Sequence, residues 1–311
     1  MLASFLTVSQ QVIILFLLIG VGFVCGKTKF LADTAVTGMT DFVLYIVTPC
    51  VMIQSLQREF DAALAGAFLQ AVLFAVITTF IGYFLARRTL HDQQPERESV
   101  YRFAAIFSNC GFMALPLESA LLGPDGMFFG AAFLAVFNIM NWTLGLYMMS
   151  RNRQLLSLRK LIPNPGIIGV TIGVILFFTS STLPTLVNTP VDYLAALNTP
   201  IPMVVIGYHL SHAKLSIVFR DFRAWLTIAE RLILLPLIGL GLGIVTGMDP
   251  IALTACMVAL CAPVAASCTM FSVIYGQDSE LSVSLVSLST LLSILTMPVM
   301  IVLTQTLLAL P

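Results

Sequence analysis

Apolar residues dominate this chain in runs of about 20 residues that short polar connectors separate. A helical run of about that length crosses the hydrocarbon core of a bilayer, since each residue adds about 1.5 Å. The pattern predicts an all-α chain with ten membrane spans, at residues 5–26, 33–57, 62–86, 100–123, 126–149, 166–186, 190–212, 222–247, 250–276 and 281–309. The first run lacks a basic leader and a cleavage pattern, so we expect it to be a retained span.

Two of these runs contain residues that interrupt helices near their middle. Residues 108–116 (Ser-Asn-Cys-Gly-Phe-Met-Ala-Leu-Pro) bring an amide, a glycine and a proline into the fourth run, and residues 261–269 bring a proline into the ninth. Such residues weaken or break a helix, and non-helical backbone at that depth persists only beside protein or a water-filled cavity. Broken helices of this kind supply solute ligands in secondary transporters. We therefore predict two discontinuous helices at a transport site.

The two halves of the chain carry similar features at a constant spacing. Thr48-Pro49 and Thr199-Pro200 are 151 residues apart, and the same shift places the first predicted break on the second. Each half has five predicted spans, an odd number, so two similarly folded halves would have opposite orientations in the membrane. The pattern therefore predicts an inverted repeat of residues 1–150 and 151–311, which form one membrane domain with the site between them.

Composition and charge agree with a membrane protein and predict its orientation. The 311 residues are 59% hydrophobic and 10% charged, whereas soluble domains carry about 25% charged residues. Thirteen of the fifteen basic residues fall in connectors on one side of the predicted spans: Lys27, Lys29, Arg87, Arg88, Arg97, Arg102, Arg151, Arg153, Arg159, Lys160, Lys214, Arg220 and Arg223. Because cytoplasmic loops are enriched in Lys and Arg, both termini are predicted to lie outside.

Several stretches along the whole chain carry a family resemblance. They are residues 44–49 (Leu-Tyr-Ile-Val-Thr-Pro), 109–117 (Asn-Cys-Gly-Phe-Met-Ala-Leu-Pro-Leu), 231–236 (Arg-Leu-Ile-Leu-Leu-Pro), 263–266, 275–278 and 289–298. In this order they resemble the auxin efflux carrier family, which includes the plant PIN carriers and many bacterial proteins. The resemblance implies a fold akin to the sodium/bile-acid symporters, with crossed helices four and nine, scaffold and transport subdomains, organic-anion substrates and a homodimer. Ser267 departs from it, because many relatives have an asparagine there, and this leaves the substrate open.

Candidate binding residues gather at the two breaks and in the fifth span. Asn109 offers two donors and one acceptor at mid-membrane, and the backbone N–H groups of residues 114–117 and 265–269 would favour an anion at half-helix N-termini. Pro116 and Pro263 are expected to create the breaks. The predicted substrate-binding set is Asn109, Cys110, Gly111, Pro116, Asn138, Asn141, Pro263, Ala266, Ser267 and Thr269. Helix–helix hydrogen bonding is the alternative role for the polar members.

Charged residues inside the predicted spans suggest further roles. Glu118 and Asp41 are candidates for ion coupling, because intramembrane carboxylates often carry protons, although Asp41 could instead pair with a basic residue near the surface. Arg231 could attract an anion, but we expect a structural ion pair or a side chain that snorkels to the interface. No metal site is expected from the cysteine spacing.

The sequence therefore predicts a secondary active transporter that moves a small organic anion, a carboxylate or an auxin-like molecule, across the inner membrane by alternating access. We expect a multi-pass homodimer without cofactor, metal or nucleic-acid partner, and coupling to H⁺ or Na⁺ stays open. No phosphate-binding loop, His-Glu-x-x-His or Gly-x-Ser-x-Gly pattern occurs in the sequence, which argues against an ATP-driven pump and an enzyme. A channel and a solute-binding membrane receptor on the same fold are the alternatives.

Overall fold

The computed structural model describes residues 2–152 and 165–308, with side chains from residue 9 onward. Arg153, Arg159 and Lys160 of the predicted basic connector lie outside the described residues. The α-helices in the described part are α1 (Leu2–Lys27), α2 (Asp33–Phe42), α3 (Thr48–Leu56), α4 (Ala62–Thr89), α5 (Pro95–Ile106), α6 (Leu115–Met140), α7 (Leu146–Ser150), α8 (Pro165–Phe178), α9 (Thr185–Ala196), α10 (Pro200–His212), α11 (Ser216–Phe219), α12 (Phe222–Ala229), α13 (Leu235–Val245), α14 (Pro250–Cys261), α15 (Ser267–Ile274) and α16 (Ser279–Leu307). Four π-helical turns join some of them: η1 (Val43–Val47), η2 (Cys110–Ala114), η3 (Asn141–Gly145) and η6 (Glu230–Leu234).

Six helical segments in the described part are long and apolar enough to cross a membrane. They are Ser9–Lys27, Asp33–Leu56, Ala62–Thr89, Cys110–Ser150, Phe222–Val245 and Ser279–Leu307. Large apolar side chains on these segments face outward, as Leu17, Phe84 and Leu295 do, each at least 65% exposed. Such a surface is stable against lipid and unfavourable against water. The chain is an all-helical, multi-pass membrane protein.

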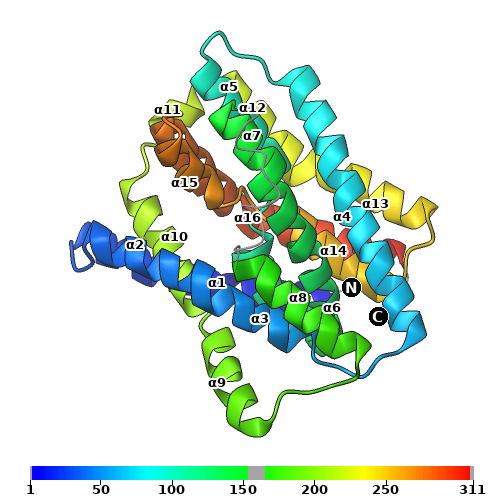
Figure 1. Cartoon of the computed structure of the whole chain (residues 1–311). Helices are drawn as coiled ribbons and strands as arrows, with labels where there is room; N and C mark the ends of the chain where they lie inside the picture. Colours follow the sequence, from blue (N-terminus) through cyan, green and yellow to red (C-terminus); the bar gives the residue numbers. More distant parts are fainter. Residues whose placement is uncertain (1, 153–164, 309–311) are drawn as a thin grey trace.

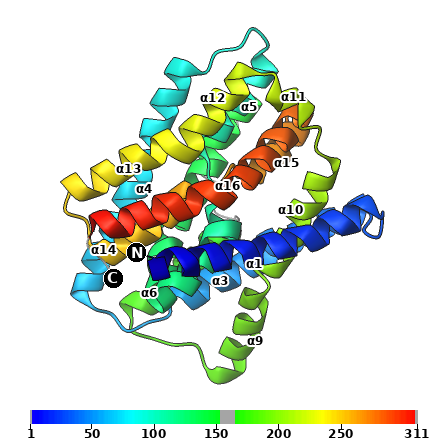
Figure 2. The same ribbon diagram turned by 180° about the vertical axis from the view of Figure 1, so that it is seen from behind.

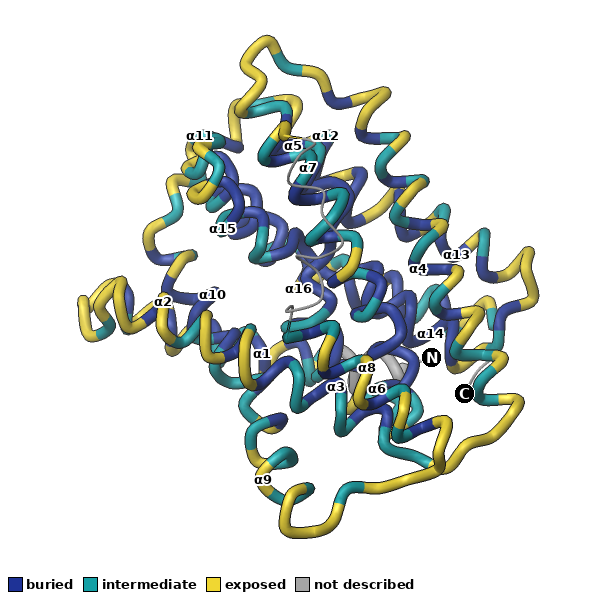
Figure 3. Tube along the Cα trace, in the orientation of Figure 1, coloured by how far each residue is buried: buried dark blue, intermediate teal, exposed yellow. Residues whose placement is uncertain are grey.

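The helices pack as two groups that meet along α6 and α14 (Figures 1 and 2). In one group α1 lies against α10, and a Cβ at Gly22 or Gly207 would overlap backbone atoms of the facing helix. Glycines at such contacts let two membrane helices approach closely. In the other group α4, α12, α13 and α16 lie beside one another (Figure 2). α14 and α16 form much of the buried centre, as Figure 3 shows.

Three of the π-helical turns come immediately before prolines. The residue before each proline donates its N–H to the carbonyl five residues earlier: Thr48 to Val43, Leu115 to Cys110, and Leu235 to Glu230. Proline has no N–H and its ring crowds the preceding turn, so a widened turn lets the helix continue past it. Pro116 therefore lies within a helix, and the prediction that it creates the first break is wrong.

Two non-helical stretches of the chain lie side by side, and we call them the paired breaks. One is residues 107–109, between α5 and η2, and the other is residues 262–266, between α14 and α15. Ser108 and Val264 form an antiparallel β-bridge, and the N–H of Asn109 donates to the carbonyl of Pro263 at 2.7 Å. Each break thus pairs backbone groups of the other, as non-helical backbone inside a membrane requires. Both predicted breaks are present, although the first ends well before Pro116.

Candidate functional site

Arg231 holds the ends of the two helices that lead into the paired breaks. It is fully buried, and its guanidinium donates to the carbonyls of Ala105 (3.3 Å) and Ile106 (2.6 Å) of α5 and of Leu260 of α14. A helix C-terminus carries about −0.5 elementary charge, so two of them offset roughly one positive charge. The prediction of an ion pair or a snorkelling side chain is therefore wrong. No carboxylate in the described part of the chain pairs with Arg231; helix-end carbonyls accept instead from both terminal nitrogens of its guanidinium.

A small cavity of about 80 Å³, here called the break cavity, lies against the paired breaks. Its walls come from α2, η1, α3, η2, α6, η3, the paired breaks and the start of α15. The residues are Thr40, Leu44, Thr48, Asn109, Gly111, Phe112, Leu134, Phe137, Asn138, Asn141, Trp142, Ala265, Ala266, Ser267 and Met270. None of these side chains is charged. Because a water takes about 30 Å³ of liquid volume, the cavity holds only a few heavy atoms until its walls move.

Two asparagine side chains in the wall of the break cavity have spare hydrogen-bonding capacity. The Nδ2 atoms of Asn109 and Asn138 are buried and have no hydrogen-bond partner in the described part of the chain. Asn141 differs, because its Oδ1 accepts from the hydroxyl of Ser267 at 2.9 Å. A buried donor without a partner costs about 1–3 kcal/mol, and a solute that brings an acceptor removes that cost. The cavity therefore suits a group with several acceptors, such as a carboxylate.

The structure brings six of the ten predicted binding residues to the break cavity: Asn109, Gly111, Asn138, Asn141, Ala266 and Ser267. The other four lie elsewhere. Cys110 is buried in the apolar core, and Pro116 lines a second cavity. Pro263 accepts the N–H of Asn109 through its carbonyl, and Thr269 is on α15, where its hydroxyl meets that of Ser282 at 3.5 Å.

The backbone donors expected after the breaks are mostly occupied. The N–H groups of Ala265, Cys268 and Thr269 donate to the carbonyls of Phe107 (2.9 Å), Ala265 (3.0 Å) and Ala266 (3.2 Å). Residues 114–117 lie inside the helical segment that already begins at Cys110. The prediction of free backbone N–H groups is wrong for residues 114–117, because the first helix starts earlier, for Ala265, because it pairs with the other break, and for Cys268 and Thr269, because the second helix starts with tight turns. The side-chain amides of Asn109 and Asn138 still have a donor without a partner among the described residues.

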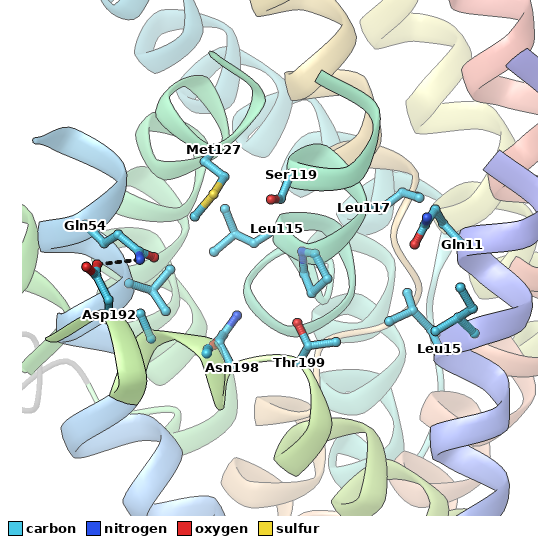
Figure 4. Close-up of a pocket in the computed structure, with 15 residues that line it drawn as sticks. Gln11, Leu15, Gln54, Leu115, Leu117, Ser119, Met127, Asp192, Asn198 and Thr199 are labelled. Atoms are coloured by element: carbon cyan, nitrogen blue, oxygen red, sulfur yellow. Dashed lines mark hydrogen bonds between the residues drawn. The ribbon is translucent and has the colours of Figure 1, made fainter. Parts of the chain in front are cut away.

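A wider cavity of about 460 Å³, here called the wide cavity, lies at the start of α6 (Figure 4). Its wall includes Asp192, whose carboxylate accepts from Gln54 (2.6 Å) and from Asn188 (2.9 Å). A carboxylate in the wall disfavours an anion by like-charge repulsion. Asn198 also lines this cavity, and its side chain donates to the carbonyl of Gly111 at 3.0 Å. Because Gly111 lines the break cavity, Asn198 links the two cavities.

Some residues that line the two cavities were not predicted from the sequence. Asn198 directly precedes Thr199-Pro200, so an amide beside a Thr-Pro pair in an apolar run was an available signal. Thr40 and Thr48 of the break cavity gave little signal, because their hydroxyls only bond back to the preceding turn.

The two carboxylates predicted for ion coupling lie outside the wall of the break cavity. Asp41 is exposed on α2 and forms no ion pair within the described residues. Glu118 is completely buried on α6.

Comparison with known proteins identifies relatives along almost the whole chain. The family model described as "Membrane transport protein" matches residues 7–157 and 151–301. An "Uncharacterized transporter" of Methanothermobacter thermautotrophicus is 22% identical over 300 residues, which cover 94% of this chain and 97% of that protein. The similarity therefore extends over nearly the whole of both sequences.

Proposed function

This chain belongs to the membrane transport protein family, which agrees with its resemblance to the auxin efflux carriers, and we propose that it is a secondary active transporter for small organic anions. One observation carries the choice of solute. The side-chain nitrogens of Asn109 and Asn138 lack partners in the wall of a cavity that contains no charged side chain. A carboxylate supplies the acceptors that these two donors lack, and it meets no like charge there.

Transport by alternating access requires that the break cavity open to each side of the membrane in turn. We propose that residues 1–150 and 151–311 form a ten-helix inverted repeat, as in transporters that place the solute at the repeat interface. The antiparallel pairing of Ser108 with Val264 supports this proposal, because one break comes from each half. A relative movement of the helices would open the cavity, since Leu44 of η1 and Ser267 of α15 line it from distant parts of the chain.

The orientation, the inner-membrane location and the homodimer belong to the same proposal. Two of the connectors with basic residues contact each other, since Arg97 pairs with Asp221 at 2.6 Å and Arg223 with Asp92 at 3.3 Å. This clustering supports one positively charged, cytoplasmic side.

The proposal is tested first by binding. A thermal-shift screen of the purified full-length protein with acetate, malonate, benzoate and indole-3-acetate should identify stabilising anions, because a ligand of the folded state raises its stability. Matched uncharged amides of the same acids should not stabilise the protein. Saturable counterflow of the best anion in proteoliposomes then distinguishes a carrier from a channel, and binding without any flux would indicate a receptor.

Isosteric variants locate the site. Asn109→Asp replaces the unpartnered donor by a carboxylate, and we expect it to abolish binding of the anion. Gln11→Glu makes the same chemical change in the wall of the wide cavity and should leave binding unchanged. The opposite result, binding lost in Gln11→Glu and kept in Asn109→Asp, would place the anion in the wide cavity and refute the proposed site.

A further inference from the structure

Glu118, in the first turn of α6, is a completely buried carboxyl group without a hydrogen-bond partner. Its exposed fraction is 0%, and both side-chain oxygens lack a partner among the described residues. An isolated carboxylate in such surroundings would be very unfavourable, because neither water nor a cation stabilises its charge. The neutral, protonated group is the form that this position tolerates.

The Glu118 side chain fits at this position because glycines without side chains lie against it. Helix α6 changes direction at Gly123, whose φ of 62° lies in the left-handed region, and the following leg of the helix packs against Glu118. A Cβ at Gly130 would overlap Oε2 of Glu118, and a Cβ at Gly126 would overlap its backbone carbonyl oxygen. The fold thus contains a compartment that a carboxyl group fills.

Among the described residues, the groups that face Glu118 carry no compensating charge. The thiols of Cys110 on η2 and Cys256 on α14 are the titratable groups that interact with it electrostatically. The helices packed against α6 carry basic residues only in their last turns, namely Lys27 of α1 and Arg87 and Arg88 of α4. Asp125 of α6 itself pairs with Arg58 at 2.8 Å.

We propose that Glu118 is a proton-binding site that exchanges its proton with the wide cavity. Its neighbours on both sides, Leu117 and Ser119, line that cavity, so a small rotation of this helical turn would bring the carboxyl group to water. The kink at Gly123 is the place where such a rotation is easiest, since glycine tolerates changes of backbone conformation. Helix α6 continues directly from η2 and therefore from Asn109. On the proposed transport function, this connection couples proton release to binding of the anion.

Infrared spectroscopy of the purified full-length protein tests the proton site without any solute. We expect the difference spectrum between the wild type and Glu118→Gln at neutral pH to contain the carbonyl stretch of a buried, protonated carboxylic acid. Glu230→Gln is the matched control, because Glu230 is also buried without a partner for its oxygens among the described residues and lies outside both cavities, and the band assigned to Glu118 should remain in this variant. A difference spectrum that contains no such band overturns the proposal.

Gly130→Ala provides a second test that does not depend on removing the carboxyl group. The added methyl group should lower the melting temperature in the wild type and be tolerated in Glu118→Ala, where the compartment is empty. Equal effects in both backgrounds would contradict the compartment.

Coupling is measured as proton release or uptake when the best anion of the carboxylate panel is added in weak buffer. The wild type should exchange protons, and Glu118→Gln should bind the anion without this exchange. If no anion binds while the infrared band is present, the transport proposal fails and the proton site stands. If Glu118→Gln exchanges protons as the wild type does, the coupling role of Glu118 is refuted.

Discussion

Replacing Arg231 by methionine tests whether the guanidinium aligns the paired breaks. The change leaves the carbonyls of Ile106 and Leu260 without their donor and also frees the weaker contact to Ala105. Each buried acceptor without a partner costs about 1–3 kcal/mol, so the two short bonds alone correspond to about 2–6 kcal/mol. Methionine also removes the cost of burying a cation, so we expect a net loss of stability of about 2–3 kcal/mol.

The assay compares melting temperature and anion affinity for three variants. Leu232→Met is the control, because Leu232 is the next residue, is 1% exposed, and such volume-conserving changes usually cost less than about 1.5 kcal/mol. Arg231→Lys keeps the charge but loses the planar fork that reaches two helix ends at once. If Arg231 aligns the breaks, both Arg231 variants should bind the anion more weakly than the control does.

Two outcomes would refute this explanation. Full affinity in Arg231→Lys together with lost affinity in Arg231→Met would mean that the charge attracts the solute. Melting temperature and affinity equal to those of Leu232→Met in both variants would mean that the helix ends need no donor.

Three further predictions follow from the same structure. Asn109→Ala and Asn138→Ala should each weaken anion binding about ten- to hundredfold, since a hydrogen bond to a charged group contributes about 1.5–3 kcal/mol. Each variant should keep nearly the melting temperature of the wild type, and unchanged affinity would remove that residue from the site. Gly22→Ala should destabilise the protein by about 1–3 kcal/mol, because the added Cβ meets the backbone of Val204. Gly20 has open space around it, so Gly20→Ala should stabilise the protein by up to about 1 kcal/mol, and thermal unfolding measures both changes. A tag after Pro311 should be accessible to a membrane-impermeant reagent from outside the cell; labelling only after the cells are opened would refute the proposed orientation.

The parts that the sequence predicts are those that local chemistry determines. Apolar runs of membrane length predict the helices, and an asparagine, a glycine and a proline within such runs predict the interruptions near Asn109 and Pro263. The position of the first break was harder to predict. A π-helical turn accommodates Pro116 within the helix, and the chain becomes non-helical nine residues earlier, at Phe107. Proline identity alone does not distinguish these two outcomes.

Partners that are distant in the chain were not predictable from the residues themselves. Arg231 donates to backbone carbonyls, which every residue possesses, so the sequence offers no complementary side chain to search for. The N–H groups of Ala265 and Thr269 are likewise occupied through backbone pairing and tight turns. Conversely, the asparagines at positions 109 and 138 could be identified because amides are costly at mid-membrane wherever they lie.

The pairing of the two breaks also has a consequence for biosynthesis. The N–H of Asn109 bonds to the carbonyl of Pro263, and the carbonyl of Phe107 accepts from Ala265. A ribosome completes the first of these residues long before it reaches the second, and a backbone group left without a partner in lipid costs several kcal/mol. The early helices therefore remain incomplete within the bilayer during synthesis, with polar backbone that water or an insertion factor has to cover. Assembly of this protein is finished by its last helices, so a translational arrest before Pro263 would leave a fragment that quality control can recognise.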